Sequence, residues 1–402
     1  MAKISERPPS WSVGLTLPST RRRTPDGTAS APGRVNLGRS RAKRPNASTS
    51  ALRARGNLLR VTQLRVAILG ATGAVGRELL HLIEQRDFPV SSIRLLASPR
   101  STGKTMRFRG QNLPVLAVSE QLFDSVDVAF FSAGGEAART WAGVAQGAGA
   151  LVIDNSSAFR MDPKVPLIVP EINWHRARPE VRYYPVGNCT GILLAMTLAP
   201  LRRFGAIRRV VVSTYQSASG AGARAMKELE EQARVFAHGE EPRAEVLPYP
   251  ILFNLFSHNS PINEYGYNEE EWKVINEVRK VLDDDDLPIE ITCVRVPVQR
   301  AHSLSVNVEF ENPAPSVGAV REAIASFPGL DLVDDREANR FPMPMLAAER
   351  DEVLVGRIRQ DQSCKNAISL FACGDQLRKG AALNAIQIAE KLVETGYLVH
   401  RN

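Results

Sequence analysis

The sequence predicts an α/β fold in which a parallel, doubly wound sheet is followed by a mixed sheet with helices on one side. From Leu64 onward, short apolar strands alternate with amphipathic helices, and a glycine-rich turn, "GATGAVG", joins the first strand to the first helix. After Cys189, strands with alternating apolar and polar residues replace that pattern. A length of 402 residues fits two domains better than one.

The elements of the first domain follow in order. The segment "LRVAILG" begins at Leu64 as a short apolar strand, and residues 74–86 place Val75, Leu79, Leu82 and Ile83 on one face of a helix. The alternation continues with a strand at 92–98, a strand at 126–133, a helix at 137–146 and a strand at 150–156. Such alternation is typical of a parallel sheet.

The second half of the chain has a different sequence pattern. Helices are predicted at about 191–204 and 221–236, and strands at "IEITCVRVPV", "SLSVNVEF", "VLVGRIRQ" and "AISLFAC". A long helix at 376–394 ends the chain, and we expect it to pack back on the first domain.

Net charge is unevenly distributed along the chain. Residues 1–60 hold 13 Lys or Arg against two acids, a charge of +11, whereas the remaining 342 residues sum to −3. Because residues 61–402 are mildly acidic, they lack the positive charge that binding to a nucleic-acid backbone requires. Apolar runs stop well short of a membrane-spanning length, and the four dispersed cysteines have neither disulfide nor zinc spacing.

The basic head at 1–60 is rich in Arg, Ser, Pro and Gly, so we expect it to be disordered. Its composition suits a transit peptide, which would place the protein in a plastid. It also suits translated upstream sequence of a bacterial gene, since no Met lies between Met1 and Met106; we favour this and a cytoplasmic location. An RNA-binding head is a third option, which deletion of 1–60 would test.

The "GATGAVG" turn predicts a dinucleotide site, because glycine lets the backbone approach a pyrophosphate at a helix N-terminus. The residues expected to contact the cofactor there are Gly70, Ala71, Thr72, Gly73, Ala74, Val75 and Gly76. The next strand ends in Ser98, Arg100 and Ser101 without a carboxylate for a ribose 2′-hydroxyl. Donors and a cation fit a 2′-phosphate, hence NADP; an ordinary solvated turn is the alternative.

Cys189 is the candidate nucleophile. It precedes a predicted helix, and a helix N-terminus lowers a thiol pKa, although a buried structural cysteine is equally compatible with this position. A thiol beside a nicotinamide indicates hydride exchange with an acyl thioester. Among six histidines, His302 is the best candidate for the proton shuttle, because it lies at a bend between two strands.

Six motifs in order resemble the aspartate-semialdehyde dehydrogenase family. They are the glycine turn, "NSSAFRMD" at 155–162, "NCT" at 188–190, "STYQSASGAG" at 213–222, "CVRVPVQRAHS" at 293–303 and "LRKGAALNAIQIAE" at 377–390. The resemblance runs from Leu64 to the C-terminus. It implies a homodimer with an NADP-binding Rossmann domain at 64–188, a glyceraldehyde-3-phosphate dehydrogenase-like catalytic and dimerisation domain at 189–373, and a returning C-terminal helix at 374–402.

The resemblance also implies residue roles. Cys189 would attack the acyl carbon of aspartyl 4-phosphate, with Asn188 in the same motif and Gln216 orienting the acyl group. His302 would act as general acid and base. Substrate groups would bind to Arg160 and Lys273 (phosphate), Arg295 (α-carboxylate) and Glu270 (ammonium). Further cofactor contacts would come from Ser132, Ala133, Gly134, Ser219, Gly220 and Asn384. No metal is implied.

Two departures from the family pattern lie beside the thiol, where Gly187 and Gly191 replace the more common Pro and Ser. They raise the question of whether the helix start is loosened. Two alternative functions remain. N-acetyl-γ-glutamyl-phosphate reductase shares the reaction class, but its thiol typically lies in "GCY". An inactive paralogue would not be expected to keep Cys189, Gln216, Arg295 and His302 together.

Overall fold

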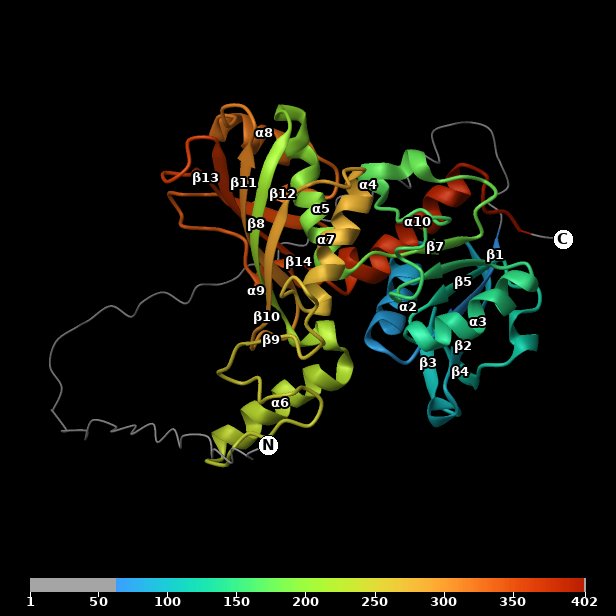
Figure 1. Ribbon diagram of the computed structural model, residues 1–402. Helices are drawn as coiled ribbons and strands as arrows, with labels where there is room; N and C mark the ends of the chain where they lie inside the picture. The colour runs from blue at the N-terminus through green and yellow to red at the C-terminus, as the bar shows by residue number, and fades with distance from the viewer. Residues whose placement is uncertain (1–62, 401–402) are drawn as a thin grey trace, which may run out of the picture. The chain divides into compact units, whose positions relative to one another are not determined.

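The structure is a computed structural model that describes residues 63–400, and the expectations for residues 1–60 lie outside this range. Two seven-stranded sheets organise the described chain (Figure 1). In the first sheet the strand order is β3-β4-β2-β1-β5-β6-β7, and all neighbours are parallel except the β3–β4 hairpin.

The first sheet has the doubly wound arrangement that the sequence predicts. Its strands are β1 (Leu64–Leu69), β2 (Val90–Ala97), β3 (Thr105–Phe108), β4 (Gln111–Ala117), β5 (Val128–Phe131), β6 (Leu151–Asp154) and β7 (Tyr183–Pro185). The main helices connecting them are α2 (Ala74–Gln85) and α3 (Gly135–Gly147), with a short α4 (Pro170–Asn173). The strand order reverses at β1, between β2 and β5, which is where doubly wound folds bind nucleotides.

The second sheet is mixed, as predicted, with the order β12-β13-β14-β11-β8-β10-β9. Its strands are β8 (Ile207–Gln216), β9 (Phe256–Ser257), β10 (Ile289–Arg295), β11 (His302–Phe310), β12 (Leu330–Leu332), β13 (Val353–Gln360) and β14 (Ala367–Gly374). Along β8, Val210, Val212 and Thr214 are buried, whereas Ser213 and Tyr215 are exposed. One face of this sheet is therefore packed against the core and the other is open.

The helices of the second half are α5 (Cys189–Leu198), α6 (Ala223–Ala237), α7 (Glu269–Leu282), α8 (Val317–Ser326) and α9 (Pro344–Ala347). Helices α5 and α7 pack side by side (Figure 1). Nearly every residue of α5 is buried, which explains its apolar run. The last helix, α10 (Leu383–Glu394), packs against α2 and against β6 of the first sheet.

Two predicted helices differ in detail. The helix expected at 191–204 begins at Cys189 and ends at Leu198, and it continues as a 3₁₀ turn, η4 (Ala199–Phe204), whose second residue is Pro200. The helix expected at 376–394 opens as a π-helix, η6 (Arg378–Ala382), before α10. A wider turn of this kind is common beside functional sites, and its position next to Cys189 is described below.

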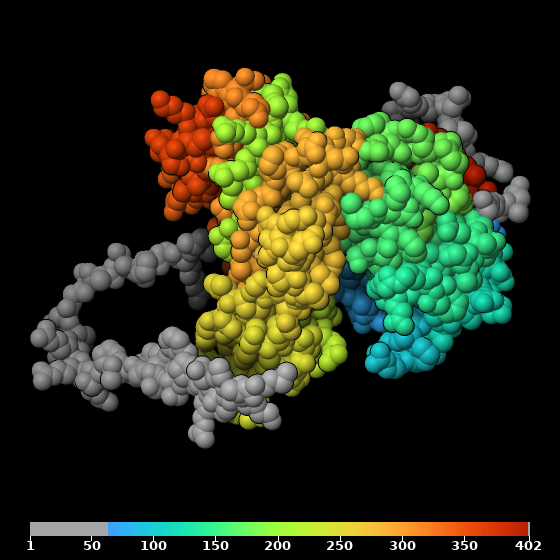
Figure 2. Space-filling model, in the orientation of Figure 1, coloured from blue at the N-terminus to red at the C-terminus, as the bar shows by residue number. Residues whose placement is uncertain are grey.

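The segment between α6 and α7 lies on the surface and is drawn in yellow in Figure 2. It presents several large exposed apolar side chains, namely Tyr249, Phe253, Leu255, Ile262 and Tyr265. Within residues 63–400, no helix combines the length and apolar character needed to cross a membrane. The same residues contain no cluster of three or more His, Cys, Asp or Glu side chains suited to a metal ion.

Candidate active site

Cys189 is the first residue of α5, and the helix start is firmly capped. The side chain of Asn188 accepts hydrogen bonds from the backbone N–H groups of Thr190 (2.9 Å) and Gly191 (3.1 Å). A Cβ at Gly191 would meet only ordinary contacts, the nearest at 3.7 Å. The helix start is therefore held by Asn188, and the glycines on either side do not leave it uncapped.

The surroundings of Cys189 favour the protonated thiol, which differs from the lowered pKa that its position at a helix start suggests. Burial and the nearby Glu270 carboxylate raise the pKa of Cys189 to about 11. The positive charges of Arg160 and Arg295 and a hydrogen bond with Thr190 act in the opposite direction but are outweighed. Activation of this thiol therefore requires a base or a bound substrate.

Gly380 of the π-helix η6 lies directly against Cys189. A Cβ at position 380 would come within 2.7 Å of the Cys189 Cβ and 3.0 Å of its Cα. Only glycine permits this approach, since real Cβ atoms do not come so close to other heavy atoms. The C-terminal segment thus forms one wall of the site.

His302 is the first residue of β11, directly after the bend between β10 and β11, and it is buried. Its Nδ1 accepts a hydrogen bond from the backbone N–H of Ser217 (3.0 Å) and lies 3.0 Å from the Ser217 hydroxyl. Burial, together with the charge of Arg295, lowers the pKa of His302 well below its usual value. With Nδ1 accepting, the proton of the neutral ring is on Nε2.

Gln216 ends β8 and connects the thiol helix to α7. Its Nε2 donates to Glu270 Oε1 (3.0 Å) and to the hydroxyl of Thr190. Its Oε1 pairs with Nε2 of His258, a residue that sequence reasoning missed. Asn188 Nδ2 donates to the same Glu270 oxygen (3.0 Å). The polar groups around the thiol thus form one connected network.

Arg295 lies at the end of β10, and its guanidinium donates to the backbone carbonyl of Ser217 (2.6 Å). Burial lowers its pKa, while Glu270 and Cys189 act to raise it, so these groups share one electrostatic environment. A Cβ at Gly220 would lie 2.8 Å from the His302 ring and 2.9 Å from the Arg295 guanidinium. Gly220 therefore lets the loop after β8 close over both side chains.

Arg160 and Lys273, the two residues expected to bind phosphate, have different partners in the structure. Arg160 donates to Glu277 Oε1 (3.1 Å) and to the Asn155 carbonyl (2.8 Å), while its buried Nε has no hydrogen-bond partner within the described chain. Lys273 is 38% exposed and pairs with Glu269 at 3.0 Å. Glu277, which sequence reasoning also missed, is buried and accepts from the Asn188 N–H as well.

The spacing of acidic residues along α7 could have identified Glu277 from the sequence. Glu270 and Glu277 are seven residues apart, two helical turns, so both face α5. Burial raises the pKa of Glu277, although Arg160 and the Asn188 N–H oppose this. Acidic side chains are seldom fully buried unless they have a partner. Here the Glu277 carboxylate accepts from the backbone N–H of Asn188, the residue before the thiol.

The glycine turn has the geometry of a dinucleotide cradle. Gly70 has a φ of +89°, and a Cβ there would lie 2.6 Å from the Ser132 carbonyl. A Cβ at Gly76 would lie 2.3 Å from the Gly70 carbonyl, so Ala71–Val75 curl tightly around this point. Gly73 caps α2 with no side-chain hydrogen bond, which leaves the helix N–H groups of Ala74 and Val75 available to an anion.

Two further segments border this turn. Ser132 donates to the carbonyls of Leu69 (3.2 Å) and Gly70 (3.3 Å), Ala133 is exposed, and Gly134 begins α3 with a φ of +89°. Ser98 and Arg100 are exposed in the turn after β2. The Ser101 hydroxyl lies 3.4 Å from that of Thr72, so this turn adjoins the glycine turn.

Ser219 and Asn384 are less accessible than the other expected cofactor residues. Ser219 is buried and bonds to the Ser217 hydroxyl (2.9 Å) and to the Gln376 amide. Asn384 is fully buried, accepts from Lys379 (3.0 Å) and donates to the Ile168 carbonyl (2.9 Å). Both amide ends of Asn384 already have protein partners.

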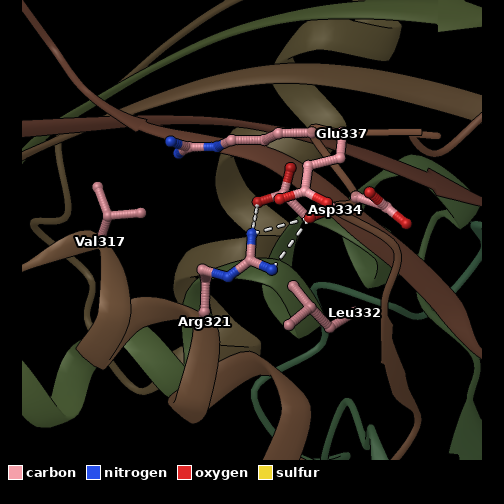
Figure 3. Close-up of a pocket in the computed structure, with 7 residues that line it drawn as sticks. Val317, Arg321, Leu332, Asp334 and Glu337 are labelled. Atoms are coloured by element: carbon pink, nitrogen blue, oxygen red, sulfur yellow. Dashed lines mark hydrogen bonds and ion pairs between the residues drawn. The ribbon is translucent and has the colours of Figure 1, made fainter. Parts of the chain in front are cut away.

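A separate open cavity of about 560 Å³ lies beside α8 and β12, and Figure 3 shows its lining. Arg321 donates to the Asp334 carbonyl (3.0 Å) and also bonds to its carboxylate. Arg321 and Asp334 are thus paired with each other. The cavity contains none of the residues of the thiol or glycine-turn sites.

Two family models match the chain, one over the first sheet and one over the second. The model of the semialdehyde dehydrogenase NAD binding domain matches residues 65–179, and that of the semialdehyde dehydrogenase dimerisation domain matches residues 198–379. The chain is 55% identical over 335 residues to the aspartate-semialdehyde dehydrogenase of Synechocystis sp., covering 83% of this chain and 99% of the relative. It is 40% identical to that of Bacillus subtilis, covering 82% and 97%.

Solved structures are similar over the same range. The aspartate semialdehyde dehydrogenase II of Vibrio cholerae, complexed with ASA, is 39% identical with a TM-score of 0.78, covering 83% of this chain and 98% of that one. The Candida albicans enzyme, solved with NADP, has a TM-score of 0.64 at 22% identity, covering 83% and 99%, and this likeness concerns the fold alone.

Proposed function

Because the chain belongs to the aspartate-semialdehyde dehydrogenase family, we propose that it catalyses the NADPH-dependent reductive dephosphorylation of L-aspartyl 4-phosphate to L-aspartate 4-semialdehyde. The single observation that carries the mechanism is the capped start of α5, where Cys189 is surrounded by Gln216, Glu270 and Arg295. The reaction belongs to the biosynthesis of lysine, threonine, methionine and isoleucine.

In the proposed mechanism Cys189 attacks the acyl carbon of the substrate. His302, kept neutral by burial, accepts the thiol proton as general base. Because its ring proton is on Nε2 while Nδ1 accepts from Ser217, this step requires Nδ1 to leave Ser217 and receive the proton. Phosphate leaves as the thioester forms. Bound NADPH would supply the hydride that reduces the thioester. His302 donates its proton to the oxygen of the resulting thiohemiacetal. It takes that proton back as the C–S bond breaks and the aldehyde is released, and the proton returns to the sulfur of Cys189.

The substrate groups are proposed to bind where the charges suit them. Arg295 holds the α-carboxylate, Glu270 the ammonium, and Arg160 with Lys273 the phosphate. The unpartnered buried Nε of Arg160 supports this, because a buried donor without an acceptor costs free energy that an incoming anion would recover. For Lys273 the proposal requires its side chain to leave Glu269.

The nucleophile is tested by Cys189→Ser. Purified protein is supplied with aspartate semialdehyde, phosphate and NADP, and formation of reduced cofactor is followed by its near-ultraviolet absorbance. Turnover should disappear while NADP binding, measured by calorimetry, is unchanged. Cys364→Ser, which alters a cysteine in the loop between β13 and β14, should retain full activity as the matched control. Normal turnover of Cys189→Ser would exclude Cys189, and an N-acetyl-glutamate semialdehyde assay in parallel tests the rival substrate.

We propose NADP rather than NAD as the cofactor, with Ser98, Arg100 and Ser101 at the 2′-phosphate. Arg100→Ala should raise the KM for NADP by about tenfold or more, since hydrogen bonds to charged groups contribute about 1.5–3 kcal/mol. The KM for NAD should change little. Arg107→Ala, at an exposed arginine in β3, is the control. Equal rates with NAD and NADP in the unmodified protein would refute the assignment.

A homodimer is proposed from the match to a dimerisation domain and from the open face of the second sheet, where Tyr215 is 39% exposed. Light scattering of the purified protein would measure the mass. A cytoplasmic location in a bacterium is likewise proposed, supported by the bacterial relatives.

A further inference from the structure

His258 follows the two-residue strand β9 directly, and the sheet register places it at the active site. Ser257 pairs with Val294 and Phe256 pairs with Arg295 at the end of β10. The next residue, His258, therefore lies beside the end of the strand that carries Arg295. Its ring is half-buried, and its Nε2 makes a close hydrogen bond with Gln216 Oε1.

The orientation of the Gln216 amide follows from its other neighbour. Burial raises the pKa of Glu270, but the hydrogen bonds from Asn188 and Gln216 and the charge of Arg295 act in the opposite direction, and the pKa lies below its usual value. An ionised carboxylate only accepts hydrogen bonds, so the amide end that faces Glu270 at 3.0 Å must be the NH₂ group. The opposite end, Oε1, consequently faces His258.

The tautomer of His258 follows in turn. Burial, together with the charge of Arg295, lowers the pKa of His258 to about 4, although Glu270 opposes this, so the ring is neutral near pH 7. A neutral imidazole has a single N–H. Because Gln216 Oε1 is an acceptor, that N–H must be on Nε2, and Nδ1 is the unprotonated nitrogen.

We propose that His258 is a positioning residue that holds the side-chain amide of Gln216 in the orientation the reaction needs. With His258 donating to Oε1, the Gln216 NH₂ group reaches both Glu270 and Thr190, the residue that follows Cys189. Without this donor, Oε1 of the buried Gln216 would lose its hydrogen-bond partner, and the amide would be free to shift away from Glu270 and Thr190. The inference rests on the proposed role of Gln216 in orienting the acyl group.

A double-mutant cycle tests the inference. His258→Phe keeps a ring but removes the donor, and it should lower kcat/KM about tenfold, the cost expected when a buried acceptor loses its partner. His258→Gln can place an amide N–H near the position of Nε2 and should stay within about threefold of the original enzyme. In a Gln216→Leu background, His258→Phe should have an effect of less than about twofold.

Each outcome of the cycle decides the matter. Equal losses from His258→Phe in both backgrounds would overturn the proposal, as would a loss in His258→Gln as large as in His258→Phe. The pH profile of kcat/KM in His258→Gln should retain both limbs of the original; a missing limb would identify a proton shuttle and contradict the proposal. Thermal unfolding of each variant separates a general loss of stability from a loss of positioning.

A measurement that needs no turnover keeps this test separate from the proposed function. The ¹⁵N chemical shifts of the His258 ring should report the neutral Nε2–H tautomer at pH 7, and a mixture of tautomers in Gln216→Leu. A predominant Nδ1–H tautomer, or a protonated ring at pH 7, would refute the positioning role even in an inactive protein. Absent turnover with the expected tautomer would instead refute the proposed function.

Discussion

Two opposing influences act on the sulfur of Cys189. The start of α5 and the charges of Arg160 and Arg295 favour the thiolate, whereas burial and the Glu270 carboxylate favour the thiol. Burial dominates, because removing an anion from water costs more than distant cations return. With a protonated thiol at Cys189 and a neutral ring at His302, the proposed mechanism forms the nucleophile only when the base takes the thiol proton.

The raised pKa of Cys189 makes its alkylation strongly pH-dependent. In the enzyme without substrate, the rate of reaction with iodoacetamide should rise about tenfold per pH unit from pH 7 to pH 10, because only the thiolate reacts. Half of the maximal rate is expected near the pKa of about 11. The label is counted by mass spectrometry, with Cys189→Ser as background. A rate that is already at its plateau at pH 7 would show that the thiolate is preformed.

At the scale of elements, the π-helix η6 and the start of α5 are built against each other. The sequence run "RKGAA" widens the turn, and Gly380 brings its backbone onto Cys189. Lys379, which is fully buried beside it, donates to Glu171 (2.5 Å), Asn384 (3.0 Å) and Gln387 (2.8 Å). All three ammonium protons have partners, so the position of η6 is closely defined.

Gly380→Ala should therefore displace Cys189 and reduce kcat at least about tenfold, because its Cβ would overlap backbone and Cβ atoms that are not free to move. The matched control is Gly143→Ala in α3, where a Cβ would meet nothing within 4 Å. This control should keep full activity and stabilise the protein by up to about 1 kcal/mol. Turnover and urea unfolding measure the pair; unchanged kcat in Gly380→Ala would contradict the contact.

At the scale of the whole described chain, ion pairs connect the first sheet to the segments beside the thiol. Glu78 of α2 pairs with Arg378 of η6 and with Arg300, both at 2.9 Å. Arg300 also pairs with Asp375 at 2.7 Å. A large apolar core shared by residues of both sheets accompanies these ion pairs. The nucleotide half and the thiol half are therefore coupled through α2 and η6.

Glu78→Gln should lower the free energy of unfolding by about 2–3 kcal/mol, since two arginines would lose their shared carboxylate in a largely buried place. The side chains of Glu78 and Arg378 are only 11% and 6% exposed. Glu394→Gln, which breaks the exposed Lys391–Glu394 pair, should change stability by less than about 0.5 kcal/mol. Urea denaturation compares the two variants, and similar values for both would contradict the importance of the network.

Sequence patterns predicted most of the fold and the main members of the site. Periodicity located α2, α6 and β11 within two or three residues, because each of these elements has one buried face. The 3₁₀ and π segments at η4 and η6 escaped prediction, since their apolar pattern resembles that of an α-helix. The roles of the site residues and the domain boundaries stay predictions until the variants above are measured.

By itself, the sequence determined the order of elements, the glycine turn and the presence of a thiol at a helix start, because these depend on local periodicity and local backbone needs. The tertiary structure alone decided the state of that thiol. Cys189 is buried by distant segments: Glu270 lies about 80 residues further along the chain, and Gly380 about 190. The same holds for His258, whose ring reaches Gln216 only through the β9–β10 register. Desolvation and hydrogen-bond direction arise only when such distant segments meet.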